Sequence, residues 1–239
     1  MAATSDRATS DLALVQGIAH TKETLAAWRA HPGPILRSWF AGSFLVAVGL
    51  LLAVLFVASQ TTPDPTYSAM PGIISPVTAA DVAHTVARNL LVLALHSLAC
   101  VAGFIAGSSM PLEARNRGGW WGAVHDYAGR GAIVFVTAAT SFSLLTQAYV
   151  LGGMTADISA RLGLHDSTFI LLLLPHALLE LTGLFLPLAA WLLASRRGDW
   201  HQLLAATFVT TSIALVMVLA AAMIETYVTP DLIRAYAGL

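Results

Sequence analysis

The sequence predicts an all-α fold: a polytopic membrane helix bundle with five transmembrane helices and an N-terminal amphipathic interfacial helix. Of the 239 residues, 57% are hydrophobic and 10% are charged, whereas soluble domains carry about 25% charged residues. Five separate runs stay apolar over about 20 residues, the length a helix needs to cross a hydrocarbon core of about 30 Å. Basic residues are concentrated in alternate connecting segments. Together these observations indicate that lipid is the solvent for most of the chain.

The five predicted spans are defined by nearly unbroken hydrophobicity. Lipid offers no hydrogen-bond partner to the backbone, so each span must be helical. The predicted spans cover residues 39–59, 86–107, 131–153, 168–194 and 203–227. Residues 1–38 are therefore predicted to form an N-terminal segment, and residues 39–239 a membrane domain.

The N-terminal segment has a helical pattern that ends at a proline-rich break. Apolar residues recur there at near-helical spacing, and Pro32-Gly33-Pro34 follows them. The repeating apolar residues are Leu12, Val15, Ile18, Leu25 and Trp28. This pattern favours a short amphipathic helix on the inner membrane surface; the alternative is a loosely ordered tail.

The distribution of basic residues predicts the orientation in the membrane. Positively charged loops are retained on the cytoplasmic side. Basic residues precede the first span and lie between spans two and three and between spans four and five: Arg7, Lys22, Arg29, Arg37, Arg115, Arg117, Arg130, Arg196 and Arg197. With five spans, this bias places the N-terminus in the cytoplasm and the C-terminus outside a bacterial inner membrane.

Charge, cysteine content and motifs exclude several classes of function. A formal net charge of -1 and 12 basic residues provide no face that could neutralise a nucleic-acid backbone. Cys100 is the single cysteine, so a disulfide or a cysteine-based zinc site within the chain is excluded. The sequence lacks a nucleophile elbow, a Walker loop, a dinucleotide fingerprint and a His-Glu-x-x-His motif. We therefore predict no nucleic-acid partner, no cofactor, no bound metal and no enzymatic activity.

Four polar residues in the spans form the candidate intramembrane site. Inserting an ionisable side chain into the membrane interior costs about 2.5–3.5 kcal/mol, so such a residue is expected to have an interaction partner or a function there. His176 and Glu180 lie one helical turn apart on one face of the fourth span. Glu225 ends the fifth span and Asn89 begins the second, so all four side chains are predicted to converge in the outer half of the membrane. A packing network, a substrate or proton pathway, and a metal site remain open as interpretations.

Two prolines are predicted to kink the fourth span near this site. Pro175 directly precedes His176, and Pro187 lies further along the same span. Each removes a backbone N–H from the helix and places its ring against the preceding turn. Such breaks line binding cavities in transporters, although they also shape membrane bundles without a binding function.

Connecting segments carry the remaining signals. The segment 61–76 contains four prolines and is predicted to be an irregular outer loop, followed by a capping box formed by Thr78 and Asp81. Asp166-Ser167 is predicted to cap the fourth span. The inner loop 111–130 combines charged and aromatic residues, which is typical of an interfacial segment or, alternatively, of a docking surface for a cytoplasmic partner. The residues of that docking loop are Arg115, Arg117, Trp120 and Trp121.

Two glutamate motifs resemble the stage II sporulation protein M family of bacterial membrane proteins. The first is Pro175-His176 followed by Glu180, and the second is Ile224-Glu225 followed by Pro230. Asn89 matches an asparagine that opens an earlier span in that family. The resemblance covers residues 81–230. Ala177, Thr182-Gly183 and Gln147-Ala148 replace residues of the family pattern, so the chain is identified as a divergent member.

The resemblance implies a protein that assembles partners without chemistry of its own. The founding role in the family is to organise peptidoglycan-degrading proteins, and the family is similar in architecture to export permeases that work with a separate ATPase. The leading hypothesis is therefore a non-enzymatic membrane subunit, the permease-like partner of an ATPase in export. The alternatives are a scaffold for cell-envelope proteins and an intramembrane metal-dependent hydrolase using His176, Glu180 and Glu225. The expected partners are the lipid bilayer and an ATPase or envelope protein; a homo-oligomer remains open.

Overall fold

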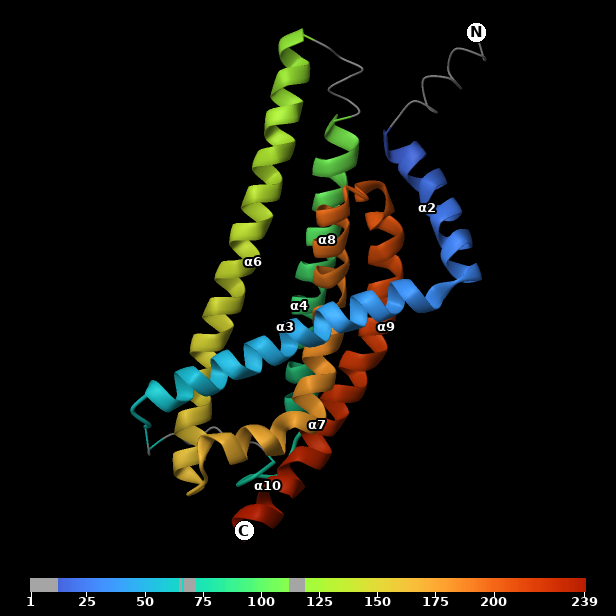
Figure 1. The fold of residues 1–239 in the computed structure, drawn as a ribbon. Helices are drawn as coiled ribbons and strands as arrows, with labels where there is room; N and C mark the ends of the chain where they lie inside the picture. The colour runs from blue at the N-terminus through green and yellow to red at the C-terminus, as the bar shows by residue number, and fades with distance from the viewer. Residues whose placement is uncertain (1–12, 65, 67–71, 112–118) are drawn as a thin grey trace. The chain divides into compact units, whose positions relative to one another are not determined.

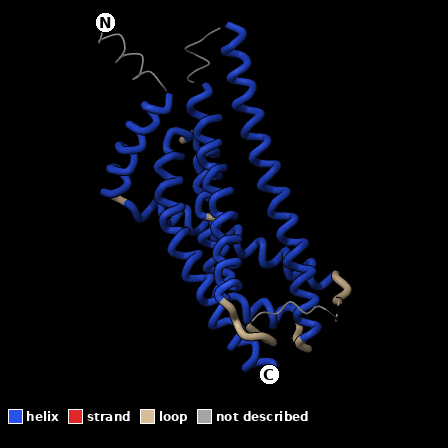
Figure 2. Tube along the Cα trace, turned by 180° about the vertical axis from the view of Figure 1, so that it is seen from behind, coloured by secondary structure: helices blue, strands red, loops and turns tan. Residues whose placement is uncertain are grey.

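The computed structural model describes residues 13–64, 66, 72–111 and 119–239, and these residues are almost entirely helical (Figures 1 and 2). Five helical stretches are long and apolar enough to cross a membrane: Pro32–Gln60, Ala79–Ser108, Ile133–Arg161, Asp166–Leu184 and Trp200–Ala237. The predicted fold class, an all-α membrane helix bundle, is confirmed.

The N-terminal segment contains helix α2, Ala13–Ala30, and helix α3, Pro32–Gln60, begins after a single intervening residue. The predicted break in the N-terminal helical run is confirmed, since α2 ends at Ala30, and both prolines lie in the first turn of α3. The first backbone N–H groups of a helix have no intrahelical partner, so proline is tolerated there. The helix that contains the first predicted span, residues 39–59, consequently begins at Pro32.

The connection after α3 agrees with the predicted irregular loop in its described residues. Asp64 accepts hydrogen bonds from the backbone N–H and hydroxyl of Thr66 at 2.8 and 2.6 Å, which lowers the pKa of this exposed carboxyl. The backbone N–H of Asp64 donates to Asp157 Oδ1 at 2.7 Å. The predicted capping box is confirmed: Thr78 donates from N and Oγ1 to Asp81 Oδ2 at 2.8 and 2.7 Å.

Helix α4, Ala79–Phe104, continues into a π-helical turn, η1, Ile105–Ser109. Met110 closes this turn with a hydrogen bond to the carbonyl of Ile105, and Pro111 follows directly. Proline cannot donate to the carbonyl four residues before it, so the turn widens to the i→i−5 pattern. The prolines of this chain thus act on helix geometry beyond the fourth span.

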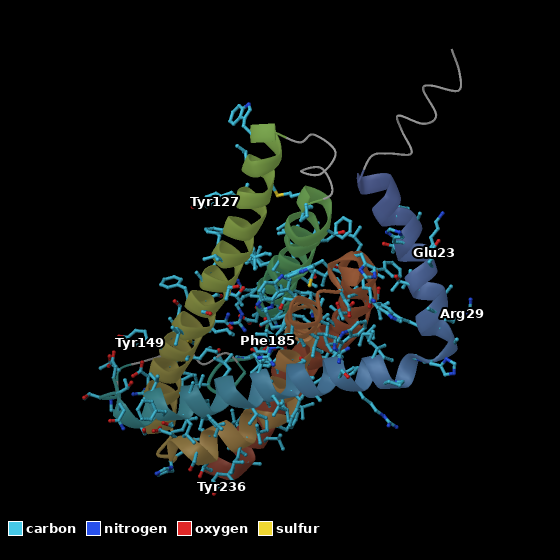
Figure 3. All side chains as sticks on the ribbon, turned by 45° about the horizontal axis from the view of Figure 1, so that its top comes forward. Glu23, Arg29, Tyr127, Tyr149, Phe185 and Tyr236 are labelled. Carbon is cyan, nitrogen blue, oxygen red and sulfur yellow. The ribbon has the colours of Figure 1, made fainter. Side chains whose placement is uncertain are left out.

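Helix α6 runs from Gly119 to Arg161 and is far longer than the predicted span 131–153. The predicted inner loop 111–130 is therefore wrong from Gly119 onward. Charged and aromatic residues do not stop a helix, and each internal glycine costs only about 1 kcal/mol. Tyr127 and Tyr149 extend outward from α6 and are 78% and 73% exposed (Figure 3). An exposed apolar and aromatic surface of this kind is typical of a contact with lipid or with another protein.

The predicted fourth span is two helices. Helix α7 spans Asp166–Leu184 and helix α8 spans Leu186–Arg197, with the break at Phe185 (Figure 1). Pro187 lacks the N–H that would bond the carbonyl of Gly183. The last α-helical hydrogen bond before the break is donated by the backbone N–H of Phe185 to the carbonyl of Leu181 at 3.0 Å. Pro175, by contrast, lies inside α7 without interrupting it.

The predicted cap of this span is also corrected. The N-cap residue is His165, whose Nδ1 accepts from the backbone N–H of Ser167 at 3.3 Å. Asp166 lies within the first turn and accepts a hydrogen bond from the Ser159 hydroxyl. Histidine is an unusual cap, so the Asp-Ser pair next to it was the stronger pattern in the sequence.

The last helical stretch extends past the predicted end at residue 227. A short 3₁₀ turn, η2, Trp200–Gln202, leads into helix α9, Leu203–Met223. A second π-helical turn, η3, Ile224–Val228, and helix α10, Thr229–Ala237, follow. Thr229 closes η3 with a hydrogen bond to Ile224, and Pro230 comes next. Both π turns are therefore followed by a residue and then a proline.

The chain forms two compact units. Unit 1 comprises Met1–Ala41, Leu95–Ala139 and Leu186–Ser212. Unit 2 comprises Gly42–Ala94, Thr140–Phe185 and Ile213–Leu239. The predicted boundary at residue 38 stays a prediction.

In unit 1 two glycines, Gly103 of α4 and Gly107 of η1, lie directly against tryptophan side chains. A Cβ added to Gly103 would lie 2.5 Å from Trp191 Nε1, and one on Gly107 would lie 2.3 Å from the Trp200 ring. Cys100 is fully buried and its thiol donates to the Pro187 carbonyl at 2.9 Å. The small residues of α4 and η1 therefore permit close contact with tryptophan.

In unit 2, helices α3 and α6 are also in close contact at a glycine. A Cβ on Gly152 of α6 would lie 2.5 Å from Val57 Cβ of α3, and the Ser43 hydroxyl donates to the Thr182 carbonyl. Gly153, the next residue, has no atom within 4 Å of an added Cβ. The contact of α3 with α6 thus depends on a missing methyl group at one position.

We expect Gly152→Ala to lower the free energy of unfolding by about 1–3 kcal/mol, because the new methyl group overpacks the contact with Val57. Gly153→Ala is the matched control and should be neutral or stabilising by up to about 1 kcal/mol, since alanine is the better helix former. Thermal melting of the purified protein in detergent, followed by circular dichroism, measures both. Equal melting temperatures for the two variants would contradict the packing described here.

Candidate functional site

Unit 2 contains a cavity of about 280 Å³. Segments of α3, α4, α6, α7, η3 and α10 line it, together with Ile73 from the loop after α3. The polar residues in the lining are Arg88, Thr155, His176, Glu180, Glu225 and Thr229. The other lining residues are apolar, so the ionisable groups lie in an otherwise hydrophobic cavity.

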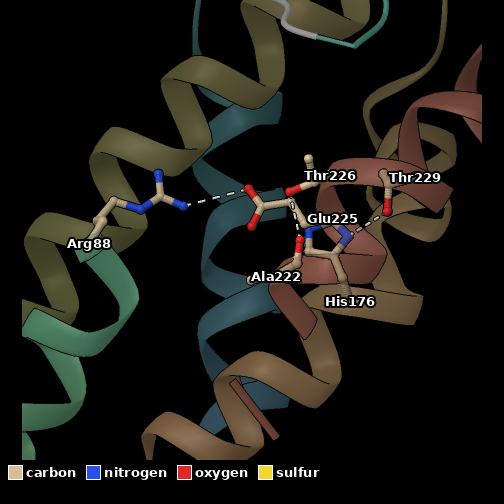
Figure 4. Close-up of polar contacts among 6 residues, drawn as sticks. All are labelled: Arg88, His176, Ala222, Glu225, Thr226 and Thr229. Carbon is tan, nitrogen blue, oxygen red and sulfur yellow. Dashed lines mark hydrogen bonds and ion pairs between the residues drawn. The ribbon is translucent and has the colours of Figure 1, made fainter. Parts of the chain in front are cut away.

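Glu225 reaches the cavity from the π turn η3. Arg88 Nη2 of α4 lies 3.6 Å from Glu225 Oε1, an ion pair that is drawn in Figure 4. The other carboxylate oxygen, Oε2, is buried and has no hydrogen-bond partner among the described residues. π turns occur frequently at functional sites because they reorient one side chain against the helix register. Glu225 is such a side chain.

His176 occupies the wall formed by α7 and α10. Its Nδ1 lies 2.8 Å from Thr229 Oγ1, and the histidine is 8% exposed (Figure 4). One of the two atoms donates; which one depends on the histidine tautomer. Thr229 is the first residue of α10, so the hydrogen bond joins the fourth span to the end of the fifth.

Glu180 lies one turn further along α7. It interacts electrostatically with Glu225, Arg88 and Asn89. Asn89 is 2% exposed, and its Nδ2 forms no hydrogen bond of 3.5 Å or less with a described residue. Glu180 has no basic group within 4.0 Å in the described part of the chain. The site therefore contains two carboxyl groups and one close counter-charge.

The structure brings together the four residues that the sequence singled out. His176, Glu180 and Glu225 line the cavity, while Asn89 is buried beside Glu180 and is not part of the lining. Sequence reasoning missed Arg88 and Thr229. A signal for Arg88 existed, because two glutamates in apolar spans require a cation and Arg88 adjoins Asn89.

Comparison with known families identifies part of the chain. Residues 120–230, a little under half of the sequence, match the family of stage II sporulation protein M. Over this segment the chain is similar to that family. The two glutamate motifs fall within the matched residues, whereas Arg88 and Asn89 precede them. No curated protein and no solved structure matches the chain.

The remaining predicted site residues lie elsewhere. Pro175 stands in α7 next to His176, and Pro187 belongs to unit 1. Trp120 is exposed at the start of α6, where Trp121 is also helical. Arg115 and Arg117 lie outside the described residues. The proposed docking loop is therefore described only in its helical part.

The described residues do not gather a metal-ligand set. No group of three His, Cys, Asp or Glu side chains in this part of the chain is placed to hold one ion. The ligand arrangement that the hydrolase hypothesis requires from His176, Glu180 and Glu225 is thus not formed.

We expect Thr229→Val to lower the free energy of unfolding by about 1–3 kcal/mol, because it leaves buried His176 without its partner while preserving shape. Thr137→Val, which removes only an exposed hydrogen bond within α6, is the control and should change stability by less than about 0.5 kcal/mol. Denaturation of the two purified variants in detergent provides the comparison. A control that is destabilised as strongly as Thr229→Val would show that the His176 contact is unimportant.

Proposed function

We propose that this protein is a non-enzymatic integral membrane subunit that binds a ligand in the unit 2 cavity and acts as the permease-like partner of an ATPase in export. The observation that supports this best is the cavity itself, where Arg88, Glu180 and Glu225 lie within helices apolar enough to cross a membrane. Ionisable residues at such positions mark substrate and ion pathways in membrane proteins.

Helix geometry at the cavity also supports a transport role. Glu225 lies on a π turn, and α7 ends at a break two residues before Pro187. Transporters place their binding sites at interrupted helices, where irregular backbone lines a cavity. A packing network alone would not need a cavity beside the carboxylates.

The ATPase partner rests on the resemblance of the family to export permeases. We expect the purified protein, solubilised gently from its native membrane, to bring with it a cytoplasmic ATPase that docks near Trp120 and Trp121. Charge reversal at Arg115 and Arg117 should weaken that association, and charge reversal at Arg161 serves as the control. Native pull-downs at moderate salt that contain no ATPase would refute the partner.

Transport and packing are separated by Glu180→Gln. We expect this variant to fold with a melting temperature within a few degrees of the parent, since glutamine keeps the shape, but to lose most transport into inverted vesicles. Glu23→Gln, an exposed site on α2, is the matched control and should retain transport. A variant that melts much lower yet transports normally would support the packing network instead.

We further propose that the N-terminus lies in the cytoplasm and the C-terminus outside the inner membrane, as the basic residues favour. A C-terminal alkaline phosphatase fusion should then be active and the corresponding green fluorescent protein fusion dark. The reverse pattern would overturn this orientation.

A further inference from the structure

The cavity of unit 2 is lined by more carboxyl groups than guanidinium groups. Its lining carries the carboxyl groups of Glu180 and Glu225 and the guanidinium of Arg88. Arg88 pairs with Glu225 at 3.6 Å, and no described basic group lies within 4.0 Å of Glu180. A carboxylate removed from water needs either a proton or a cationic partner.

A further polar atom at this place lacks a partner. Glu225 Oε2 is buried without a hydrogen-bond donor among the described residues, so it can accept one more hydrogen bond. Asn89, which is almost fully buried, interacts with Glu180 through its side chain, but Nδ2 has no acceptor within 3.5 Å in the same set of residues. Buried polar groups are rarely left unpaired, so Glu225 Oε2 marks a position where a further hydrogen-bond donor is expected.

The rest of the enclosure is hydrophobic. Leu50, Val54, Leu151, Met154, Phe169 and Leu173 are among its apolar walls. A cavity of about 150 Å³ holds one benzene molecule, so the 280 Å³ found here has room for roughly 10–12 non-hydrogen atoms. A ligand that fills it must be mainly apolar and must carry its polar group at one end.

We propose that the cavity binds an amphiphilic primary amine, with its ammonium group between Glu180 and Glu225 and its apolar body against α3, α6 and α7. The ammonium supplies three hydrogen-bond donors and a positive charge. This inference deepens the proposed function, since it names the ligand class of the same site.

Other ligand classes fit less well. A metal ion needs several oxygen or nitrogen ligands at close range, and the described residues do not gather three such side chains. An anion would find Arg88 already paired and two carboxyl groups beside it. A neutral apolar molecule would leave Glu180 without a counter-charge.

The test uses the full-length protein in phosphatidylcholine nanodiscs and three probes of one shape: 4-phenylbutylamine, 4-phenylbutanol and 4-phenylbutyrate. Binding is measured by equilibrium dialysis against empty nanodiscs, which corrects for partition into lipid. We expect saturable binding of the amine, with the alcohol and the acid at least roughly tenfold weaker, the lower end expected for losing a charged hydrogen bond. Equal binding of amine and alcohol would overturn the proposal.

Variants locate the bound amine. Glu180→Gln should weaken amine binding roughly tenfold to a hundredfold, while Glu23→Gln on α2 should leave it unchanged. Arg88→Gln frees the second carboxylate, so amine affinity should be maintained or increased. Weaker amine binding in a folded Arg88→Gln protein, or unchanged binding in Glu180→Gln, would contradict the proposed contact.

The amine can come from a small molecule or from a lipid headgroup, and nanodisc composition distinguishes these sources. If phosphatidylethanolamine nanodiscs reduce the Glu180-dependent binding, the ammonium site is supported and the lipid competes for it. If that binding is unchanged, the site is supported with a free amine as its ligand. Amine selectivity without an ATPase partner would refute the export role alone, whereas an ATPase partner without amine selectivity would refute this inference alone.

Discussion

The ion pair between Arg88 and Glu225 is the interaction on which the arrangement of unit 2 depends. It joins α4 to the π turn at the end of α9, and Arg88 is the basic residue that lines the cavity of unit 2 beside the two glutamates. Moving a charged group out of water costs several kcal/mol even after relaxation, and a nearby opposite charge offsets part of that cost. The pair supplies an opposite charge to only one of the two carboxyl groups. Glu180, which also lines the cavity, has no basic side chain within 4.0 Å among the described residues.

Proline positions explain why these side chains meet. Pro230 prevents a normal α-helical hydrogen bond to Thr226, and the turn before it widens into η3, which carries Glu225. The same proline starts α10 in the register that presents Thr229 to His176. Pro111 follows η1 in the same way. Both π turns of this chain thus lie a few residues ahead of a proline.

Much of the fold could be predicted from the sequence because membrane spans are a matter of length and hydropathy. The number of spans, the helical class and the capping box at Thr78 followed from composition and local chemistry. The start of α6 at Gly119 did not, because charged and aromatic residues are compatible with helix and with loop alike. The break at Phe185 was expected near Pro187, but the π turns were not, since i→i−5 bonding depends on how the following helix packs.

The site was only partly visible in the sequence. His176 and Glu180 share a helical face, so their proximity followed from spacing alone. The meeting of Glu225 with Arg88 required knowing which helices pack together, which the sequence does not state. Thr229 gave no signal, because a threonine at a helix start is ordinary.

Cys100 has a practical consequence. It is the single sulfhydryl of the chain, and it is fully enclosed in unit 1, where its hydrogen occupies the Pro187 carbonyl. Maleimides and thiol-reactive spin labels will therefore not react with the folded native protein. A cysteine introduced anywhere on the surface can then be modified by itself, so that distance and accessibility measurements need no prior removal of a native thiol.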